Sequence, residues 1–181
     1  MIDFPLRVYI SSSWNGDLKA EIEAVKNLIE KELLMHPVYP SLASPLDITS
    51  DYFTRLKDCD IIVVLLGSKY SDHVENEFKF ALDKEIPAIV FQKECECEEE
   101  LQKKIETLYR LVTIKPFKTT ADLKNDVKAS IIDLLGKALR ARRKIEKAIK
   151  PLIGSEIRTI WPKPTDSEYK GVPRINPFER R

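Results

Sequence analysis

The chain has 181 residues, with 30 Lys and Arg against 29 Asp and Glu, so its net charge of +1 indicates no class of partner. Apolar residues make up 43% and charged residues 33%, which is typical of a globular domain and excludes a chain disordered throughout. The three cysteines are too few for a disulfide scaffold and favour a reducing compartment. No signal peptide is recognisable, and no apolar run approaches the roughly 20 residues that a membrane-spanning helix needs. We therefore expect a cytoplasmic protein without a membrane partner.

Strand and helix patterns alternate along the first 150 residues. The run Ile61–Leu66 is continuously apolar and is followed by Gly67, as expected for a parallel strand covered on both faces. Strands are predicted, in chain order, over residues 6–10, 37–40, 61–66, 87–91 and 111–114. Helices are predicted over residues 18–29, with Asp17 as the cap, and over 49–57, 73–84, 98–109 and 123–150. This alternation predicts an α/β fold, a flavodoxin-like doubly wound parallel sheet of five strands in the order 2-1-3-4-5.

The C-terminal end differs from the rest. Seven Lys and Arg lie between Lys137 and Lys150 against a single glutamate, Glu146, and Pro151 ends the long helix. Residues 151–181 hold five of the eleven prolines and have no apolar periodicity. We expect a domain over 1–150 and a tail over 151–181 that is disordered or bound to a partner. The basic helix could contact nucleic acid or an acidic protein, but no aromatic residues interleave with its charges, so we favour a solvated helix and expect no nucleic-acid binding.

A candidate ligand site follows from the predicted topology. In an open parallel sheet, ligands bind beyond the carboxyl ends of the strands where the strand order reverses, which is between the first and third strands here. The loops 11–16 and 67–73 lie at that point and are rich in hydroxyl groups. The next helix carries Glu75 and Glu77. At about 100° per residue, Glu77 falls inside the apolar arc of this helix and Glu75 falls just outside it.

Glu77 is the residue that the pattern singles out. A carboxylate among apolar side chains at the rim of a pocket would have a raised pKa and a stronger electrostatic effect on a ligand. The alternative is an ordinary glutamate that extends from the apolar rim into water. Ser11, Ser12 and Ser13 could donate hydrogen bonds to a phosphate or a ribose, or could simply shape the turn. No glycine-rich phosphate motif and no metal-ligand spacing are present, so we expect neither a metal nor a bound cofactor.

Several segments carry a family resemblance. Val8-Tyr9-Ile10-Ser11-Ser12-Ser13 followed by Asp17-Leu18 resembles the opening strand and loop of TIR-like domains, in particular those of an uncharacterised family often fused to signal-transducing NTPases. The same family pattern is matched, in order, by Cys59-Asp60, by Gly67-Ser68-Lys69-Tyr70-Ser71, by Glu75-Asn76-Glu77-Phe78-Lys79-Phe80-Ala81 and by the segment 84–91. The resemblance covers residues 6 to 92, about half of the chain.

The resemblance implies a function. The wider superfamily includes TIR domains that cleave NAD and nucleoside 2-deoxyribosyltransferases, which place a glutamate on this helix four residues before a small residue, as Glu77 stands before Ala81. It implies an N-glycosidase that takes NAD or a related nucleotide as its substrate and acts as a homo-oligomer, with Glu77 as the catalytic carboxylate. Its substrate-binding residues would be Ser11, Ser12 and Asn15 at the ribose or phosphate end, and Lys69, Tyr70 and His73 at the rim.

Two departures from the family patterns keep alternatives open. TIR enzymes often carry tryptophan where this chain has His73. The transferases carry an Asp and a Gly-Thr pair ahead of their glutamate. In this chain Asp72 is the only possible counterpart of that Asp, and no Gly-Thr pair is present. The alternatives are a signalling or adaptor module that binds a nucleotide or a protein without cleaving it, and a nucleoside 2-deoxyribosyltransferase.

Overall fold

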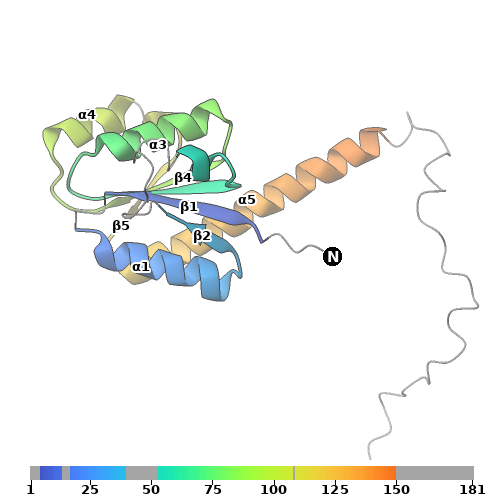
Figure 1. Ribbon diagram of the computed structural model, residues 1–181, viewed down its shortest axis with the longest axis horizontal. Helices are drawn as coiled ribbons and strands as arrows, with labels where there is room; N and C mark the ends of the chain where they lie inside the picture. Colours follow the sequence, from blue (N-terminus) through green and yellow to red (C-terminus); the bar gives the residue numbers. More distant parts are fainter. Residues whose placement is uncertain (1–4, 14–16, 40–52, 108, 150–181) are drawn as a thin grey trace, which may run out of the picture. The chain divides into compact units, whose positions relative to one another are not determined.

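A five-stranded parallel sheet forms the centre of the protein (Figure 1). The computed structural model describes residues 5–13, 17–39, 53–107 and 109–149. The strand order is β2-β1-β3-β4-β5, so the predicted doubly wound order 2-1-3-4-5 is confirmed. The strands are β1 (Arg7–Ser12), β2 (His36–Val38), β3 (Ile61–Leu66), β4 (Ala88–Lys93) and β5 (Ile114–Phe117).

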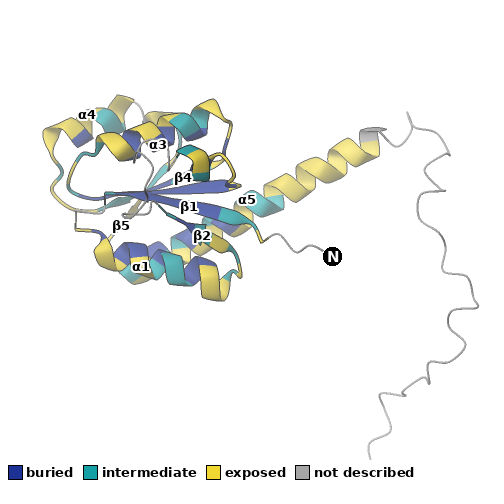
Figure 2. Cartoon of the chain, viewed as in Figure 1, coloured by how far each residue is buried: buried dark blue, intermediate teal, exposed yellow. Residues whose placement is uncertain are grey.

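Helices cover both faces of this sheet (Figure 1). One face packs against α1 (Lys19–Asn27), its π-helical continuation η1 (Leu28–Glu32) and the first half of α5 (Thr120–Ile149). The other face packs against α3 (Asp72–Asp83) and α4 (Glu99–Thr107). All six residues of β3 are buried, as its unbroken apolar run predicts for a strand covered on both sides (Figure 2).

The first strand separates its side chains between the two layers. Val8 and Ile10 belong to the cluster with α1 and α5, whereas Tyr9 belongs to the cluster with α3 and α4. This is the period of two that a strand imposes. Ser11 therefore shares the face of Tyr9, and Ser12 shares the face of Ile10, which places the two neighbouring serines in different layers.

Two local predictions are wrong. The last strand is Ile114–Phe117 and not 111–114, because residues 109–111 form a 3-10 turn, η2 (Tyr109–Leu111), and Pro116 is tolerated in an edge strand. Asp17 does not cap α1, which begins at Lys19 without a side-chain cap. Its carboxylate instead accepts a hydrogen bond of 3.3 Å from the backbone N–H of Ser68, so it links the loops that follow β1 and β3.

The chain divides into two compact units, Met1–Leu135 and Gly136–Arg181, within α5. In the second unit the helix continues from Gly136 to Ile149, and residues 137–147 are all exposed, as expected for a solvated basic helix. Leu139 and Ile145 are each 58% exposed on it. Within the described ranges no helix is long and apolar enough to cross a membrane. The predicted tail over 151–181 lies outside the described residues. The helix predicted over 49–57 is described only from residue 53, and residues 53–56 are helical.

Candidate functional site

Glu77 lies on α3 and faces the carboxyl end of β1. Its two carboxylate oxygens accept hydrogen bonds from two different hydroxyl groups of that strand. The Tyr9 hydroxyl donates to Oε1 at 2.8 Å, and the Ser11 hydroxyl donates to Oε2 at 2.5 Å. Tyr9 and Ser11 reach the same carboxylate because residues i and i+2 of a strand point to the same face. The pair of donors fixes the orientation of the Glu77 side chain.

Burial controls the charge of Glu77. The residue is 3% exposed, and both of its hydroxyl partners are fully buried. Burial raises the pKa of the Glu77 carboxyl to about 7, although the hydrogen bonds from Ser11 and Tyr9 act in the opposite direction. The raised pKa confirms the direction expected for a carboxylate set into an apolar helix face. The same burial rules out the alternative in which Glu77 extends into water.

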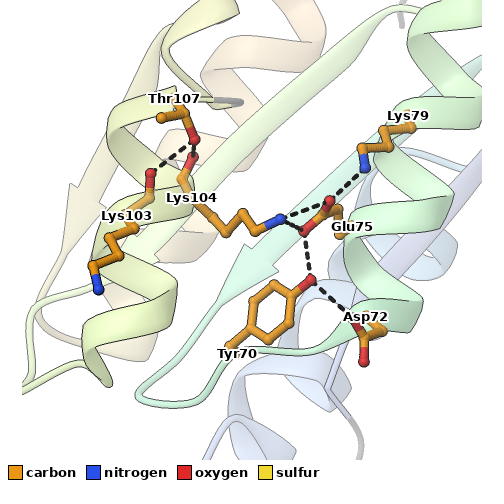
Figure 3. A network of polar contacts seen from close by, with 7 residues as sticks. All are labelled: Tyr70, Asp72, Glu75, Lys79, Lys103, Lys104 and Thr107. Carbon is orange, nitrogen blue, oxygen red and sulfur yellow. Dashed lines mark hydrogen bonds and ion pairs between the residues drawn. The ribbon is translucent and has the colours of Figure 1, made fainter.

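Glu75, two residues earlier on α3, has a different environment (Figure 3). It is 4% exposed, so its expected place outside the buried face is wrong. Lys104 of α4 lies 2.8 Å from its Oε2, Lys79 lies 2.5 Å from its Oε1, and the Tyr70 hydroxyl donates to it at 2.5 Å. Burial alone would raise the pKa of Glu75, but the hydrogen bonds from Lys104, Lys79 and Tyr70 lower it to about 2. Glu75 therefore stays ionised and joins α3 to α4.

A small hollow lies at the end of β3, close to this network. Ser13, Lys69 and Tyr70 contribute to its wall, with Gly67 and Val74 among its other lining residues. Its volume is about 10 Å³, which is room for about one water molecule and not for a sugar. Glu77 is not among the lining residues. The hollow and the Glu77 carboxylate are therefore separate features of the same sheet edge.

The structure brings some of the predicted site residues together and separates others. Ser11 contacts Glu77 directly. Lys69 and Tyr70 line the small hollow. Ser12 lies in the other layer, where its buried Oγ has no hydrogen-bond partner among the described residues. His73 is exposed on the first turn of α3. Asn15 lies outside the described residues.

Sequence reasoning missed Tyr9, which contributes one of the two hydroxyl groups on Glu77. The signal was available, because strand alternation places Tyr9 beside Ser11. It also missed the Glu75 network. Lys79, four residues later on the same helix, was a local signal for it. Lys104 comes from another helix, so no local pattern in the sequence indicated its contact with Glu75.

This arrangement supplies a carboxyl group that changes its protonation near neutral pH and is held by two hydroxyl groups. A carboxylate has about four lone-pair sites, so Glu77 keeps acceptor capacity beyond the bonds from Tyr9 and Ser11. Such a group can accept a proton or stabilise a positive centre. No cluster of three or more His, Cys, Asp or Glu side chains suited to a metal ion occurs within the described part of the chain.

Comparisons with known proteins show the fold. A CMP N-glycosidase of Clostridium botulinum, BcmB, superposes with a TM-score of 0.54 at 18% identity, covering 68% of this chain and 98% of that one. The TIR domains of the activated Roq1 resistosome, which recognises the pathogen effector XopQ, give a TM-score of 0.44 at 16% identity, covering 78% of this chain and 82% of that one. A de novo designed Rossmann 2x3 protein gives 0.42 at 20% identity, covering 71% of this chain and 90% of that one.

The likeness to the CMP N-glycosidase shows a shared fold and leaves function to be argued from the site. No curated protein matches the chain. One protein-family model does match, over residues 7–150, which include every strand of the sheet and the helices α1, α3, α4 and α5. The chain belongs to the family described as "Domain of unknown function (DUF4062)".

Proposed function

We propose that this domain binds a nucleotide, NAD or a related one, and cleaves its N-glycosidic bond with Glu77 as the catalytic carboxylate. The single observation that carries the proposal is the buried Glu77 side chain, held by Tyr9 and Ser11 at the carboxyl edge of the sheet with a pKa raised to about 7. The fold shared with a CMP N-glycosidase agrees with it at the level of architecture.

The chemistry follows from the charge that develops during cleavage. When the bond between the anomeric carbon and the base breaks, its electron pair leaves with the base and the ribose carbon becomes positive. An ionised Glu77 would stabilise this centre or form a transient ester with it, and water would then take the place of the base. Tyr9 and Ser11 would act as positioning residues, because each holds one carboxylate oxygen. Such preorganised charge is usually the largest single contribution to catalysis.

Access is the requirement that this mechanism must meet. Glu77 is 3% exposed, and the hollow at the end of β3 holds only about 10 Å³. A ribose therefore reaches the carboxylate only if neighbouring groups move. Substrate-induced opening of loops is common in enzymes, and self-association is a second way to complete a site. A specific activity, the turnover per protein molecule, that rises with protein concentration would identify self-association as the route.

The same burial favours a second candidate, a binding or adaptor module without turnover. In that case Glu77 is a structural carboxylate whose two oxygens are satisfied by Tyr9 and Ser11 inside the core. A third candidate, nucleoside 2-deoxyribosyltransfer, uses the same carboxylate but passes the sugar to a second base. These candidates differ in the products that they release, so one set of assays separates them.

The test compares the wild type with Glu77→Gln over a range of protein concentrations. Release of nicotinamide from NAD, release of cytosine from CMP and base exchange between deoxynucleosides are measured in parallel. We expect the wild type to have one of the two hydrolytic activities. In Glu77→Gln that activity should be lower by about two orders of magnitude or more, because the amide keeps the shape of the carboxylate and loses its charge. Asp83→Asn is the matched control, because the Asp83 side chain belongs to the same helix and is 72% exposed. This variant should retain full activity.

Each contrary outcome has a defined meaning. Base exchange lost in Glu77→Gln identifies the transferase. Hydrolysis that persists in Glu77→Gln shows that another group is the catalyst. No turnover of any kind by concentrated, folded wild-type protein refutes the enzymatic proposal and supports the binding module.

A further inference from the structure

Two of the three cysteines lie close together at the carboxyl edge of the sheet. Cys95 and Cys97 belong to the segment that joins β4, which ends at Lys93, to α4, which begins at Glu99. Cys95 is exposed and Cys97 is half-buried, whereas Cys59 is buried. The mechanism proposed for Glu77 uses neither of the two neighbouring thiols, so their role is open to a separate argument.

The Cys95 and Cys97 thiols contact one another. The Cys97 thiol donates to the Cys95 carbonyl at 3.4 Å, and the two thiols also share a hydrogen bond. Only two peptide units separate the residues, which limits the distance between their Cα atoms to about 7 Å. The chain also bends at Cys95, which shortens this distance. A separation of that size suits a disulfide, whose Cα atoms lie about 4.4–6.8 Å apart.

Cys97 also contacts the loop that follows β3 and begins at Gly67. Its thiol donates to the Gly67 carbonyl at 3.6 Å. The next residue, Glu98, contacts the same loop twice: its N–H donates to the Ser68 carbonyl at 2.8 Å, and its Oε2 accepts from the Tyr70 N–H at 3.0 Å. The position of Cys97 is therefore coupled to the position of this loop.

We propose that Cys95 and Cys97 form a redox-sensitive pair, which a low-molecular-weight disulfide oxidises to an intramolecular disulfide and a low-molecular-weight thiol reduces again. Disulfides of proteins in reducing compartments are usually of this transient kind. The new bond draws the Cys97 sulfur towards Cys95 and removes the S–H group that faces the Gly67 carbonyl. The loop after β3 therefore changes with the redox state of the pair. This inference does not depend on whether Glu77 is catalytic.

The reaction is a thiol–disulfide exchange in two steps. The exposed Cys95, as its thiolate, attacks one sulfur of the small disulfide, whose S–S bond breaks, and one half leaves as a thiolate. Cys97, as its thiolate, then attacks the Cys95 sulfur of the mixed disulfide and expels the second half. The protein loses two electrons and two protons, and the small disulfide gains both as it becomes two thiols.

The surroundings of Cys95 affect the rates of both directions. Partial loss of water, then the adjacent Cys97 thiol and the Asp17 carboxylate, raise the pKa of the Cys95 thiol, while Lys93 acts in the opposite direction. Less thiolate is then present at neutral pH, so oxidation should be faster at pH 8.5 than at pH 7. A thiol of raised pKa is also a poor leaving group, so the disulfide should be reduced slowly once it has formed.

The test incubates the full-length wild-type protein with oxidised glutathione at pH 8.5 and follows it by mass spectrometry. Tryptic cleavage separates the thiols, because residues 94–103 contain Cys95 and Cys97 and residues 58–69 contain Cys59. We expect peptide 94–103 to lose two hydrogen atoms without gaining glutathione, and excess dithiothreitol to reverse the change. The buried Cys59 is the internal control and should remain a thiol.

Two variants separate the intramolecular disulfide from other products. Cys97→Ser lacks the second thiol, so its Cys95 should stop as a mixed disulfide with glutathione. Cys95→Ser keeps only the half-buried thiol and should react at least about 10-fold more slowly than the wild type, because attack requires access to the sulfur. In ¹⁵N-labelled wild-type protein, oxidation should shift the amide signals of Gly67, Ser68 and Tyr70, and the same treatment of Cys95→Ser should not.

Four results would overturn the proposal. They are two unchanged thiols in the oxidised wild type, a wild type that stops at the mixed disulfide as Cys97→Ser does, a disulfide that joins two copies of the chain, or an intramolecular disulfide that leaves the signals of the loop after β3 unchanged. Oxidation of Cys59 at the same rate would show that the protein had unfolded around its thiols, and would equally refute a specific pair.

Discussion

Glu75 and Glu77 lie two residues apart on α3, and both are less than 5% exposed, yet their charges are controlled in opposite directions. Cations surround Glu75, and its pKa is about 2. Hydroxyl groups surround Glu77, and its pKa is about 7. Burial raises the pKa of both carboxyls. Around Glu77 the two hydroxyl donors do not offset the effect of burial on the pKa, whereas around Glu75 two ammonium groups together with the Tyr70 hydroxyl do.

The largest expected effect is the pH dependence of stability that Glu77 imposes. Its pKa in the folded protein, about 7, is above its ordinary value of 4.5, so the folded state binds more protons between these values. The free energy of unfolding should therefore fall by about 3 kcal/mol as pH rises from 4.5 to 7 and stay level above pH 7. Glu77→Gln carries no titratable proton and should lack this fall. Urea unfolding of both proteins from pH 4.5 to 8.5 measures the difference.

The hydroxyl partners make Glu77→Gln a fair probe. Tyr9 and Ser11 can each donate or accept, so they can pair with either end of an amide. Wild type and variant that lose the same stability over this range would show that Glu77 ionises normally in the folded protein. The contrast with Glu75 would then disappear.

The next effect concerns Glu75. Glu75→Gln removes the negative charge that pairs with Lys79 and Lys104 and replaces one of the two acceptor oxygens with an NH₂ donor. It should lower stability by about 1–3 kcal/mol at neutral pH, the usual cost of breaking a buried polar pair. Because the folded pKa of Glu75 is depressed, its contribution is present above pH 4.5 and is lost as pH falls from 4.5 towards 2. The wild type and variant should therefore converge in acid. Calorimetry should record a fall in melting temperature of roughly 2–4 °C per kcal/mol.

A matched control separates the network from ion pairing in general. Glu99 pairs with Lys103 on α4 at 2.7 Å, but this glutamate side chain is 82% exposed. Glu99→Gln should change stability by less than about 0.5 kcal/mol. Equal effects of Glu75→Gln and Glu99→Gln would mean that burial adds nothing to the Glu75 network.

The comparison also shows what the sequence could reveal. The sheet order was predictable because Ile61–Leu66 and the alternation of elements are local patterns, and the position of Glu77 followed from the helix period. The burial of Glu75 was not predictable from the sequence. It depends on the contact with Lys104, which is 29 residues away on a helix whose packing no local pattern encodes. The last strand was misplaced for a related reason, since only its edge position makes Pro116 acceptable.

The separation of Ser11 from Ser12 lies between these cases. Strand alternation predicts it, provided that the strand continues to Ser12, but the polar run Ser11-Ser12-Ser13 has the composition of a turn. β1 extends two residues further than the apolar pattern indicates because its end pairs with Val64 and Leu65 of β3. Backbone pairing with a distant strand thus decided which hydroxyl reaches Glu77.

The smallest expected effect tests the hydroxyl side of the comparison. Tyr9→Phe keeps the fully buried ring and removes the donor on Oε1 of Glu77. Because this hydrogen bond lowers the pKa of Glu77, its loss should move that pKa further upward. The bond to an ionised carboxylate is the stronger one, so the variant should lose about 1 kcal/mol more stability at pH 8.5 than at pH 5. Titration of the ¹³C-labelled side-chain carboxyl follows the pKa directly. A pKa that stays constant or falls in Tyr9→Phe would show that Ser11 alone controls the carboxylate, and Ser11→Ala should then produce the upward shift.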